Sequence, residues 1–223
     1  MTTRLTDGGH DWHPSWSADG KKIIYDSTEG DTSRTYEISP DGSGSPKLLL
    51  ESGSVAAHRS PDGPVAFMRL ERGRVTLAVH VPPDGHITQL GPGAEPQFSP
   101  GGKWLAFVEP GGAGIGVRPF PGPGPRLQIS SGPAAQPRWS RDGTQLFYIA
   151  ADKKLTAVSF DAGTGRAGAP RHLFQTRIIG ASLVGFQYDV ASDGRFLIHS
   201  LPASSSPLTL LTGWTALLKS RPE

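Results

Sequence analysis

The chain has 223 residues, including 29 Gly, 21 Pro and no Cys. Frequent Gly and Pro argue against a bundle of long helices, and the lack of a three-residue glycine period excludes collagen. Without cysteine the chain has no disulfide, thiol nucleophile or Cys-ligated metal centre. The 22 Lys+Arg residues nearly balance the 20 Asp+Glu residues and form no basic run, so we expect no nucleic-acid partner.

The N-terminal residues MTTRLTDGGHDWH are polar and lack the apolar core of a signal peptide. The most apolar stretch, residues 208–218, contains Thr and Gly and is too short to span a bilayer. We therefore expect no insertion into a membrane. The compartment stays open: cytoplasmic if Met1 is the natural start, or periplasmic if the chain is truncated.

Five copies of one motif follow one another along the chain, each with a short first segment, a Ser-x-Asp-Gly-type turn and an apolar run. The copies are PSWSADGKKIIYDS from Pro14, AHRSPDGPVAFMRL from Ala57, PQFSPGGKWLAFVE from Pro96, PRWSRDGTQLFYIA from Pro137 and YDVASDGRFLIHS from Tyr188. The turn positions are Asp19, Asp62, Gly101, Asp142 and Asp193. A repeat of about forty residues is typical of propeller blades and of helical repeats.

Within each unit the predicted strands come in the same order. The first strand ends on an anchor residue, which is large and apolar in Trp16, Phe98 and Trp139 and weaker in Val190, and the turn predicts a hairpin into the second strand. Second strands are predicted at 23–25, 65–68, 105–108, 146–149 and 196–198. Third strands are predicted at 36–38, 75–81, 115–117 and 155–160, and fourth strands at 47–50, 87–90, 127–129 and 172–174. Four strands per unit, with no long stretch of helical period, predict an all-β propeller rather than helical repeats or a β-sandwich.

We predict one β-propeller domain over residues 1–223, built of about five four-stranded blades. The blades cover residues 13–51, 56–90, 95–130, 136–175 and 186–212, with residues 2–6 added to the fifth. Pairing of residues 2–6 with residues 207–212 would close the ring and cover two strand edges that otherwise invite aggregation. The alternative is a fragment of a propeller with six to eight blades.

The P-x-W-S-x-D-G motif followed by an apolar strand resembles the WD-like repeat of TolB-type bacterial β-propellers. The ending PLTLLTGWTALLKS resembles the last strand and tail of such proteins. Similar repeats occur in the propellers of prolyl-oligopeptidase-like peptidases and in sensor regions of bacterial serine/threonine kinases. The resemblance covers nearly the whole chain but implies a fold more than an activity, because the signature residues form turns and inter-blade packing.

Two residues depart from the repeat. Arg59 stands where the other anchors are apolar, which predicts either a loosely packed second blade or a charge turned inward. Gly101 replaces the Asp of the third turn, which removes a side-chain acceptor but leaves the turn possible.

The sequence gives little support for catalysis, and we predict no enzyme activity, no cofactor and no metal. It has no G-x-S-x-G elbow, its GGAGIG stretch lacks the Lys-Ser/Thr of a phosphate-binding loop, and its histidines lack metal-ligand spacing. We interpret Asp26, Glu29 and Asp31 as a solvated acidic loop rather than a calcium site. A glycosidase needs paired carboxylates; Glu95 and Asp189 are the best candidates, but we interpret both as hydrogen-bonded surface acids.

The remaining prediction is a non-catalytic, monomeric propeller that binds or scaffolds a protein or peptide partner. The predicted binding residues are polar and lie just before each anchor, around one mouth of the axial channel: His13, His58, Glu95, Gln97, Gln136, Arg138, Gln187 and Asp189. The alternatives are a carbohydrate-active propeller hydrolase and the detached sensor part of a bacterial kinase or peptidase. Trp12 and Trp214 could anchor a partner if exposed, although we favour packing over the ring seam for Trp214.

Overall fold

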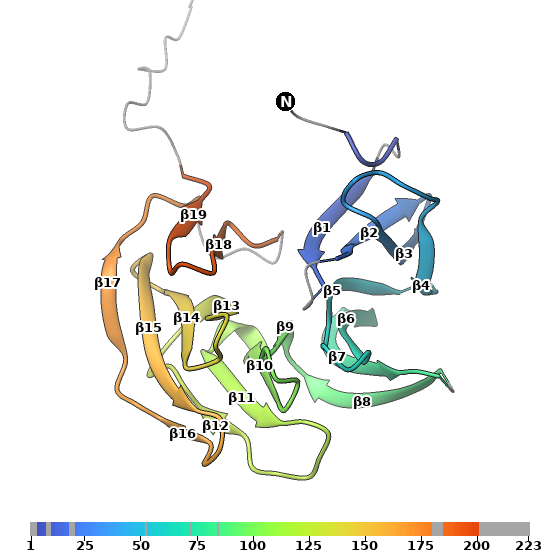
Figure 1. The fold of residues 1–223 in the computed structure, drawn as a ribbon. Coiled ribbons are helices and arrows are strands. Elements are labelled where there is room, and N and C mark those ends of the chain that lie inside the picture. Colours follow the sequence, from blue (N-terminus) through green and yellow to red (C-terminus); the bar gives the residue numbers. More distant parts are fainter. Residues whose placement is uncertain are drawn as a thin grey trace, which may run out of the picture.

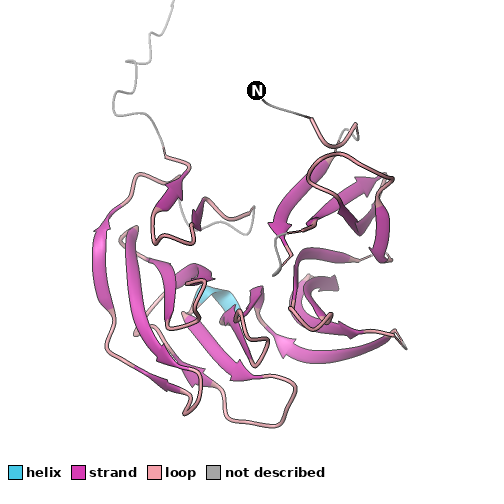
Figure 2. Ribbon diagram, in the orientation of Figure 1, coloured by secondary structure: helices cyan, strands magenta, loops and turns pink. Residues whose placement is uncertain are grey.

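The computed structural model describes residues 4–7, 10–17, 21–51, 53–71, 73–83, 85–179 and 185–200. Strands and loops make up almost all of this part of the chain (Figure 2). A short 3₁₀ turn, Pro110–Gly112, is the one helical element among the described residues. These residues include no helix with the length and apolarity that crossing a bilayer requires.

The strands form five antiparallel sheets, and paired strands follow one another along the chain except that β17 pairs with β15. The first sheet contains β1 (Asp11–Trp16), β2 (Ile23–Glu29), β3 (Thr32–Ile38) and β4 (Lys47–Leu50), and the second contains β5 (Ser54–Arg59), β6 (Val65–Glu71), β7 (Arg74–Val81) and β8 (His86–Pro92). The third contains β9 (Ala94–Phe98), β10 (Trp104–Val108), β11 (Ile115–Pro119) and β12 (Leu127–Gln128). The fourth contains β13 (Ala134–Trp139), β14 (Gln145–Ala150), β15 (Lys154–Asp161) and β17 (Arg171–Gln175), with the short β16 (Arg166–Ala167) paired to the end of β15. The fifth sheet has β18 (Tyr188–Val190) and β19 (Phe196–Ile198).

The sheets are arranged around a common centre, with β1, β5, β9, β13 and β18 innermost (Figure 1). Innermost strands of successive sheets contact one another. The structure therefore confirms the predicted all-β propeller, and we refer to the sheets as blades 1 to 5. The predicted pairing of residues 2–6 with 207–212 lies largely outside the described residues; the described part of the first segment, residues 4–6, forms no strand.

The anchor positions are structurally equivalent in all five blades. Each anchor pairs with the first apolar residue of the next strand, as in Trp16 with Ile23 and Trp139 with Leu146. The same register joins Arg59 to Val65, Phe98 to Leu105 and Val190 to Phe196. The turn between the two strands also survives in blade 3, where Gly102 N donates to Ser99 O at 2.8 Å although Gly101 replaces the expected Asp. The repeat thus specifies a hairpin of constant register, because turn length fixes strand pairing.

The hydrophobic core lies between successive blades. One cluster joins Ala66 and Val79 of blade 2 to Phe98 and Leu105 of blade 3. The largest cluster joins blades 2, 3 and 4. A further cluster joins blade 1 to blade 2, and another joins blade 4 to blade 5. Blades 2, 3 and 4 therefore bury both faces against neighbours, which explains the continuous apolar runs of their second strands.

The anchor side chain packs toward the preceding blade. In blade 4, the indole N–H of Trp139 donates to Gln97 O of blade 3 at 3.1 Å. In blade 2, Arg59 instead donates to the buried carboxylate of Glu37 in blade 1. The departure at Arg59 is therefore an inter-blade ion pair, and blade 2 is well packed, with Val65 and Phe67 each 2% exposed. Trp16 occupies the same position in blade 1 but remains 51% exposed.

A hydrogen-bond ladder joins the innermost strands around the hub. His13, Ala56, Glu95 and Gln136 occupy equivalent bulges, each with a positive φ between 50° and 58°. Such a backbone conformation costs energy for a residue with a side chain and needs support from its surroundings. Three of these residues receive support because their backbone N–H donates to the preceding blade: Ala56 N to Asp26 Oδ2 (2.6 Å), Glu95 N to Met68 Sδ (3.1 Å) and Gln136 N to Glu95 Oε2 (2.6 Å). In blade 5, Gln187 N makes the corresponding bond to Gln136 Oε1 (2.8 Å).

The acceptor in this ladder comes from one of two positions. In blades 1 and 2 the acceptor lies on the second strand, three residues after the residue that pairs with the anchor. Asp26 follows Ile23 and Met68 follows Val65 at this distance, and both side chains accept an N–H of the next blade. The equivalent residues of blades 3 and 4 are Val108 and Ile149, whose side chains cannot accept. There the bulge residues Glu95 and Gln136 accept instead, so every described junction keeps one bond.

Candidate functional site

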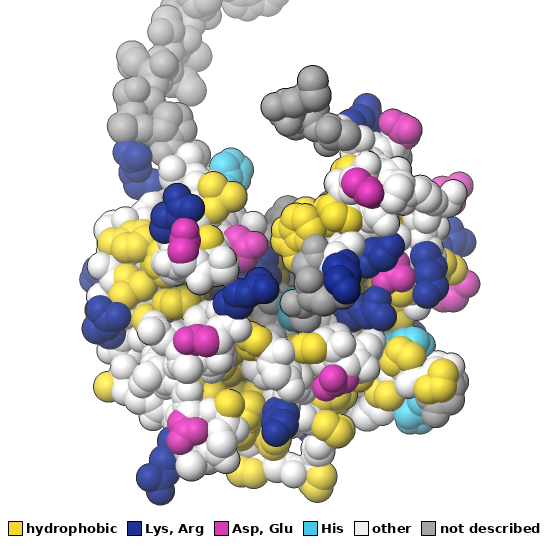
Figure 3. All heavy atoms as spheres, in the orientation of Figure 1, with side chains coloured by type: hydrophobic (Ala, Val, Ile, Leu, Met, Phe, Trp, Pro, Cys, Tyr) yellow, Lys and Arg dark blue, Asp and Glu magenta, His cyan; other side chains and the backbone are white. Residues whose placement is uncertain are grey.

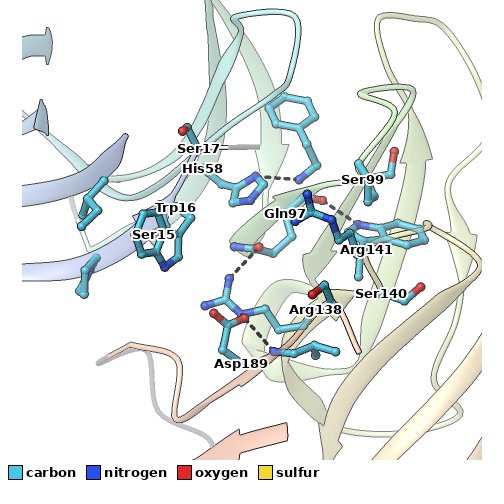
Figure 4. A pocket seen from close by; sticks show the side chains of 17 residues that line it. Ser15, Trp16, Ser17, His58, Gln97, Ser99, Arg138, Ser140, Arg141 and Asp189 are labelled. Carbon is cyan, nitrogen blue, oxygen red and sulfur yellow. Dashed lines mark hydrogen bonds and ion pairs between the residues drawn. The ribbon is translucent and has the colours of Figure 1, made fainter. Parts of the chain in front are cut away.

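A cavity of about 880 Å³ opens at the hub and receives residues from all five blades (Figure 4). We call it the axial cavity. Its walls include the ends of the innermost strands and the turns that follow them, represented by Ser17, Ser99, Ser140 and Ser192. Its size falls within the range of ordinary ligand sites.

Arg138, from β13, is the central charged group of the axial cavity. Its Nη1 donates to Gln97 Oε1 at 2.9 Å, and its guanidinium carbon lies 3.7 Å from the centre of the Phe186 ring. Asp189 Oδ1 lies 3.7 Å from Arg138 Nε, which is buried and has no hydrogen-bond partner among the described residues. Burial lowers the pKa of Arg138, while the charge of Asp189 raises it. A guanidinium stays protonated in either case, so the cavity holds an oriented, partly paired cation.

His58, from β5, is an uncharged residue in the lining of the same cavity. Burial lowers its pKa to about 3, and the charge of Arg138 contributes to the lowering. Its Nδ1 therefore accepts the N–H of Phe98 at 3.1 Å, which joins blade 2 to blade 3. At neutral pH this imidazole adds no positive charge and acts as a positioning group.

Two further residues form the exposed rim of the axial cavity. Trp16 presents half of its surface, and Arg141 is exposed in the turn after β13. In the space-filling view, hydrophobic side chains gather over blade 1 at the edge of the central hollow (Figure 3). The rim thus offers an exposed apolar side chain, Trp16, and an exposed cation, Arg141, next to the buried Arg138.

The eight predicted site residues divide into three places. His58, Gln97, Arg138 and Asp189 come together in the axial cavity. His13, Gln136 and Gln187 belong to the hub ladder: His13 Nδ1 lies 3.0 Å from Asp26 Oδ2, Gln136 is fully buried, and Gln187 accepts Ile179 N through Oε1 at 3.0 Å. Glu95 lines a different cavity, described below, at the other end of the hub.

Two interpretations of acidic residues were wrong. Asp26 is not part of a solvated loop, because it is 1% exposed inside β2 and accepts from Thr35 Oγ1 at 2.7 Å as well as from Ala56 N. Glu95 is not a surface acid, because it is 3% exposed. Burial raises its pKa to about 7, against the lowering effects of the Gln136 N–H and the charges of Arg138 and His13. Glu29 and Asp31 are exposed, as expected.

Sequence reasoning missed Trp16 and Arg141 as lining residues and Asp26 as a hub residue. Each carried a signal. Arg141 is the one charged residue at the x position of the five Ser-x-Asp-type turns, where the other copies have Ala, Pro, Pro and Ser. Asp26 is an acid at a position that is apolar in blades 2, 3 and 4. Trp12, the other unassigned tryptophan, is 47% exposed with its indole N–H on Thr28 Oγ1 at 3.1 Å, whereas Trp214 lies outside the described residues.

The fold and the axial cavity together define a β-propeller with a polar hub, and several solved structures share the propeller fold. TolB from Acinetobacter baumannii is similar to 75% of this chain with 22% identity and a TM-score of 0.60. A protein in the nidogen/laminin complex matches 78% of the chain with 15% identity and a TM-score of 0.54, and hydrazine synthase from Kuenenia stuttgartiensis matches 77% with 18% identity and a TM-score of 0.53.

At these identities the similarity shows the fold alone. The chain spans 44% of the TolB chain, 67% of the nidogen/laminin chain and 51% of the hydrazine synthase chain. No protein-family model matches the sequence, and no curated protein matches it.

Proposed function

We propose that this chain is a non-catalytic binding propeller with TolB-like repeats, which recognises a segment of a protein or peptide partner at the axial cavity. The observation that carries the proposal is the convergence of all five blades on one polar cavity with a preoriented guanidinium. Binding residues held by a rigid sheet scaffold lose little entropy when a partner docks.

The lining chemistry favours a segment that carries an acidic side chain next to an apolar one. Arg138 and Arg141 supply two positive charges, Asp189 supplies one negative charge, and His58 is neutral. Trp16 offers an exposed aromatic surface of the kind that anchors protein interfaces. A carboxylate can accept from guanidinium N–H groups that are already desolvated, which strengthens the hydrogen bond.

The carbohydrate hydrolase alternative receives less support. Glycosidases use two carboxyl groups that flank the scissile bond. Among the described residues that line the axial cavity, Asp189 alone carries a carboxylate. Its Oδ1 accepts Val190 N at 2.9 Å and lies near Arg138, which is the environment of a structural acid.

We expect charge reversal at the rim to weaken peptide binding without disturbing the fold. A phage-displayed random dodecapeptide library is selected on the intact chain, and the affinity of an enriched synthetic peptide is measured by fluorescence polarisation. Because Arg141 is exposed, Arg141→Glu leaves the core unchanged and weakens binding at least about tenfold by repelling the acidic side chain. Trp16→Ala causes a similar loss by removing the apolar contact.

Arg166→Glu is the matched control, because Arg166 is an exposed arginine on β16 at the outer edge of blade 4. This variant retains full affinity. Equal affinity of the Arg141→Glu variant and the unmodified chain, or enriched peptides without acidic residues, would contradict the proposed site.

A further inference from the structure

A second cavity, of about 730 Å³, lies between blades 2, 3 and 4. We call it the side cavity. It is lined by the hairpins that join second to third strands, including residues 73–76 and 109–112. The axial cavity is lined by the turns that join first to second strands. Because successive hairpins of an antiparallel blade alternate between the two ends of its strands, the two cavities open on opposite faces, and they share no lining residue.

The wall of the side cavity is apolar and made of small side chains. Ala94, Val108, Ala134 and Ile149 line it and are each at most 7% exposed, so the wall is fixed by the core behind it. A rigid apolar wall with few polar groups is the common form of a small-molecule site.

Glu95 is one of the residues that line the side cavity, and it is buried. Its Oε2 accepts Gln136 N at 2.6 Å. The charges of Arg138 and His13 act on Glu95. Among the described residues, however, Arg138 pairs with Asp189 and His13 with Asp26, and no cationic side chain forms an ion pair with Glu95. Two other charged residues line the cavity. Glu109 is neutralised by Arg126, whose Nη1 lies 2.8 Å from Glu109 Oε2, and Arg74 is exposed at the rim, where water screens its charge.

We propose that the side cavity binds a small organic amine, with its ammonium group against Glu95 and its apolar body against the Ala94, Val108 and Ile149 wall. An ammonium ion supplies a direct ion-pair partner for Glu95, in surroundings where the Coulomb attraction is stronger than in water. A ligand carboxylate would meet like charge there. A neutral ligand would gain the apolar contacts but leave the acid unpaired.

The test uses three probes of similar shape and different charge: 2-phenylethylamine, 2-phenylethanol and 3-phenylpropionate. Each is titrated into the full chain at pH 8, above the pKa of Glu95, and backbone amide shifts are followed by NMR. We expect the amine to shift the amides of Ala94, Ala134 and Ala150 and to bind at least about tenfold more tightly than either other probe.

Three variants separate the proposed ionic contact from general cavity effects. Glu95→Gln keeps the acceptor for Gln136 N but removes the charge, so the preference for the amine disappears. Glu29→Gln removes the charge of an exposed acid that lies outside the cavity, so the preference remains. Ala150→Leu narrows the partly buried edge of the cavity and weakens all three probes together.

The proposal is overturned if the amine fails to bind at millimolar concentration or if the three probes bind equally. It is also overturned if the shifted amides belong to the axial cavity or if Glu95→Gln keeps the preference. An amide spectrum of each variant that matches the spectrum of the unmodified chain away from the cavity shows that the fold is intact, so loss of binding is not loss of structure.

Discussion

Replacement of Asp26 by alanine is expected to lower the free energy of unfolding by about 3–5 kcal/mol. The Asp26 carboxylate is 1% exposed and accepts from Thr35 Oγ1 at 2.7 Å and from Ala56 N at 2.6 Å, while His13 Nδ1 lies 3.0 Å from Oδ2. Alanine leaves the Ala56 N–H buried without its acceptor, while Thr35 Oγ1 keeps only its contact with Ser54 Oγ at 2.9 Å. Since the Ala56 N–H belongs to a bulge with positive φ, its backbone also loses the bond that supports it.

Urea unfolding followed by tryptophan fluorescence measures this loss. Asp26→Asn keeps the shape and one acceptor oxygen, so we expect a smaller loss of about 1–2 kcal/mol. Asp31→Ala removes an exposed acid from the adjacent hairpin and should change stability by less than about 0.5 kcal/mol. An Asp26→Ala variant as stable as the Asp31→Ala variant would show that the blade 1 to blade 2 junction does not depend on this carboxylate.

Replacement of Glu95 by glutamine is expected to stabilise the protein at pH 8 and to have little effect at pH 4. Burial raises the pKa of Glu95 from 4.5 to about 7, so the folded chain holds a proton that the unfolded chain has released between these values. The stability associated with the protonated acid is complete below pH 4.5 and is lost as pH rises through 7. A difference of this size corresponds to about 3 kcal/mol.

The glutamine variant cannot ionise, and its side-chain oxygen can still accept Gln136 N. Thermal and urea unfolding at several pH values between 4 and 8 should therefore show the two curves separating as pH rises, with the variant above. Glu29→Gln provides the control, because the Glu29 side chain is 89% exposed, and its difference from the unmodified chain should stay nearly constant. Parallel pH profiles for the Glu95→Gln variant and the unmodified chain would contradict a raised pKa at Glu95.

The two consequences of Glu95→Gln are opposite in sign, which makes the residue informative. The variant should fold more stably at pH 8 yet lose the preference for an amine in the side cavity. A buried ionisable group that costs stability is a frequent mark of a functional site, because packing alone would favour its removal.

Much of the fold could be predicted from the sequence. The anchors Trp16, Phe98 and Trp139 and their following turns identified hairpins whose register the structure shows to be equivalent. The predicted third and fourth strands correspond to β3, β7, β11 and β15 and to β4, β8, β12 and β17, with ends that differ by a few residues. These elements were predictable because turn chemistry and strand patterning are local properties.

The site was less predictable. Position before the anchor identified Gln97 and Arg138, which do line the axial cavity, but the same rule also selected Gln136, which is fully buried in the hub ladder. The reason is the bulge: it turns the residue at its centre toward the next blade and sends residues two positions later toward the cavity. Side chains of a regular strand alternate between its two faces, and a bulge interrupts this alternation. Counting by twos across the bulge therefore assigns a side chain to the wrong face of the strand.

The sequence by itself determined that the chain folds as repeated antiparallel hairpins around a hub, because each blade's turns and apolar strands lie within about forty consecutive residues. Only the tertiary structure decided which polar side chains are buried. Asp26 meets Ala56, Glu95 meets Gln136, and Arg59 meets Glu37 across blade junctions, between residues far apart in the chain. Solvation and charge depend on such neighbours, so the ladder, the raised pKa of Glu95 and the division into two cavities follow from the packing of blades rather than from the repeat.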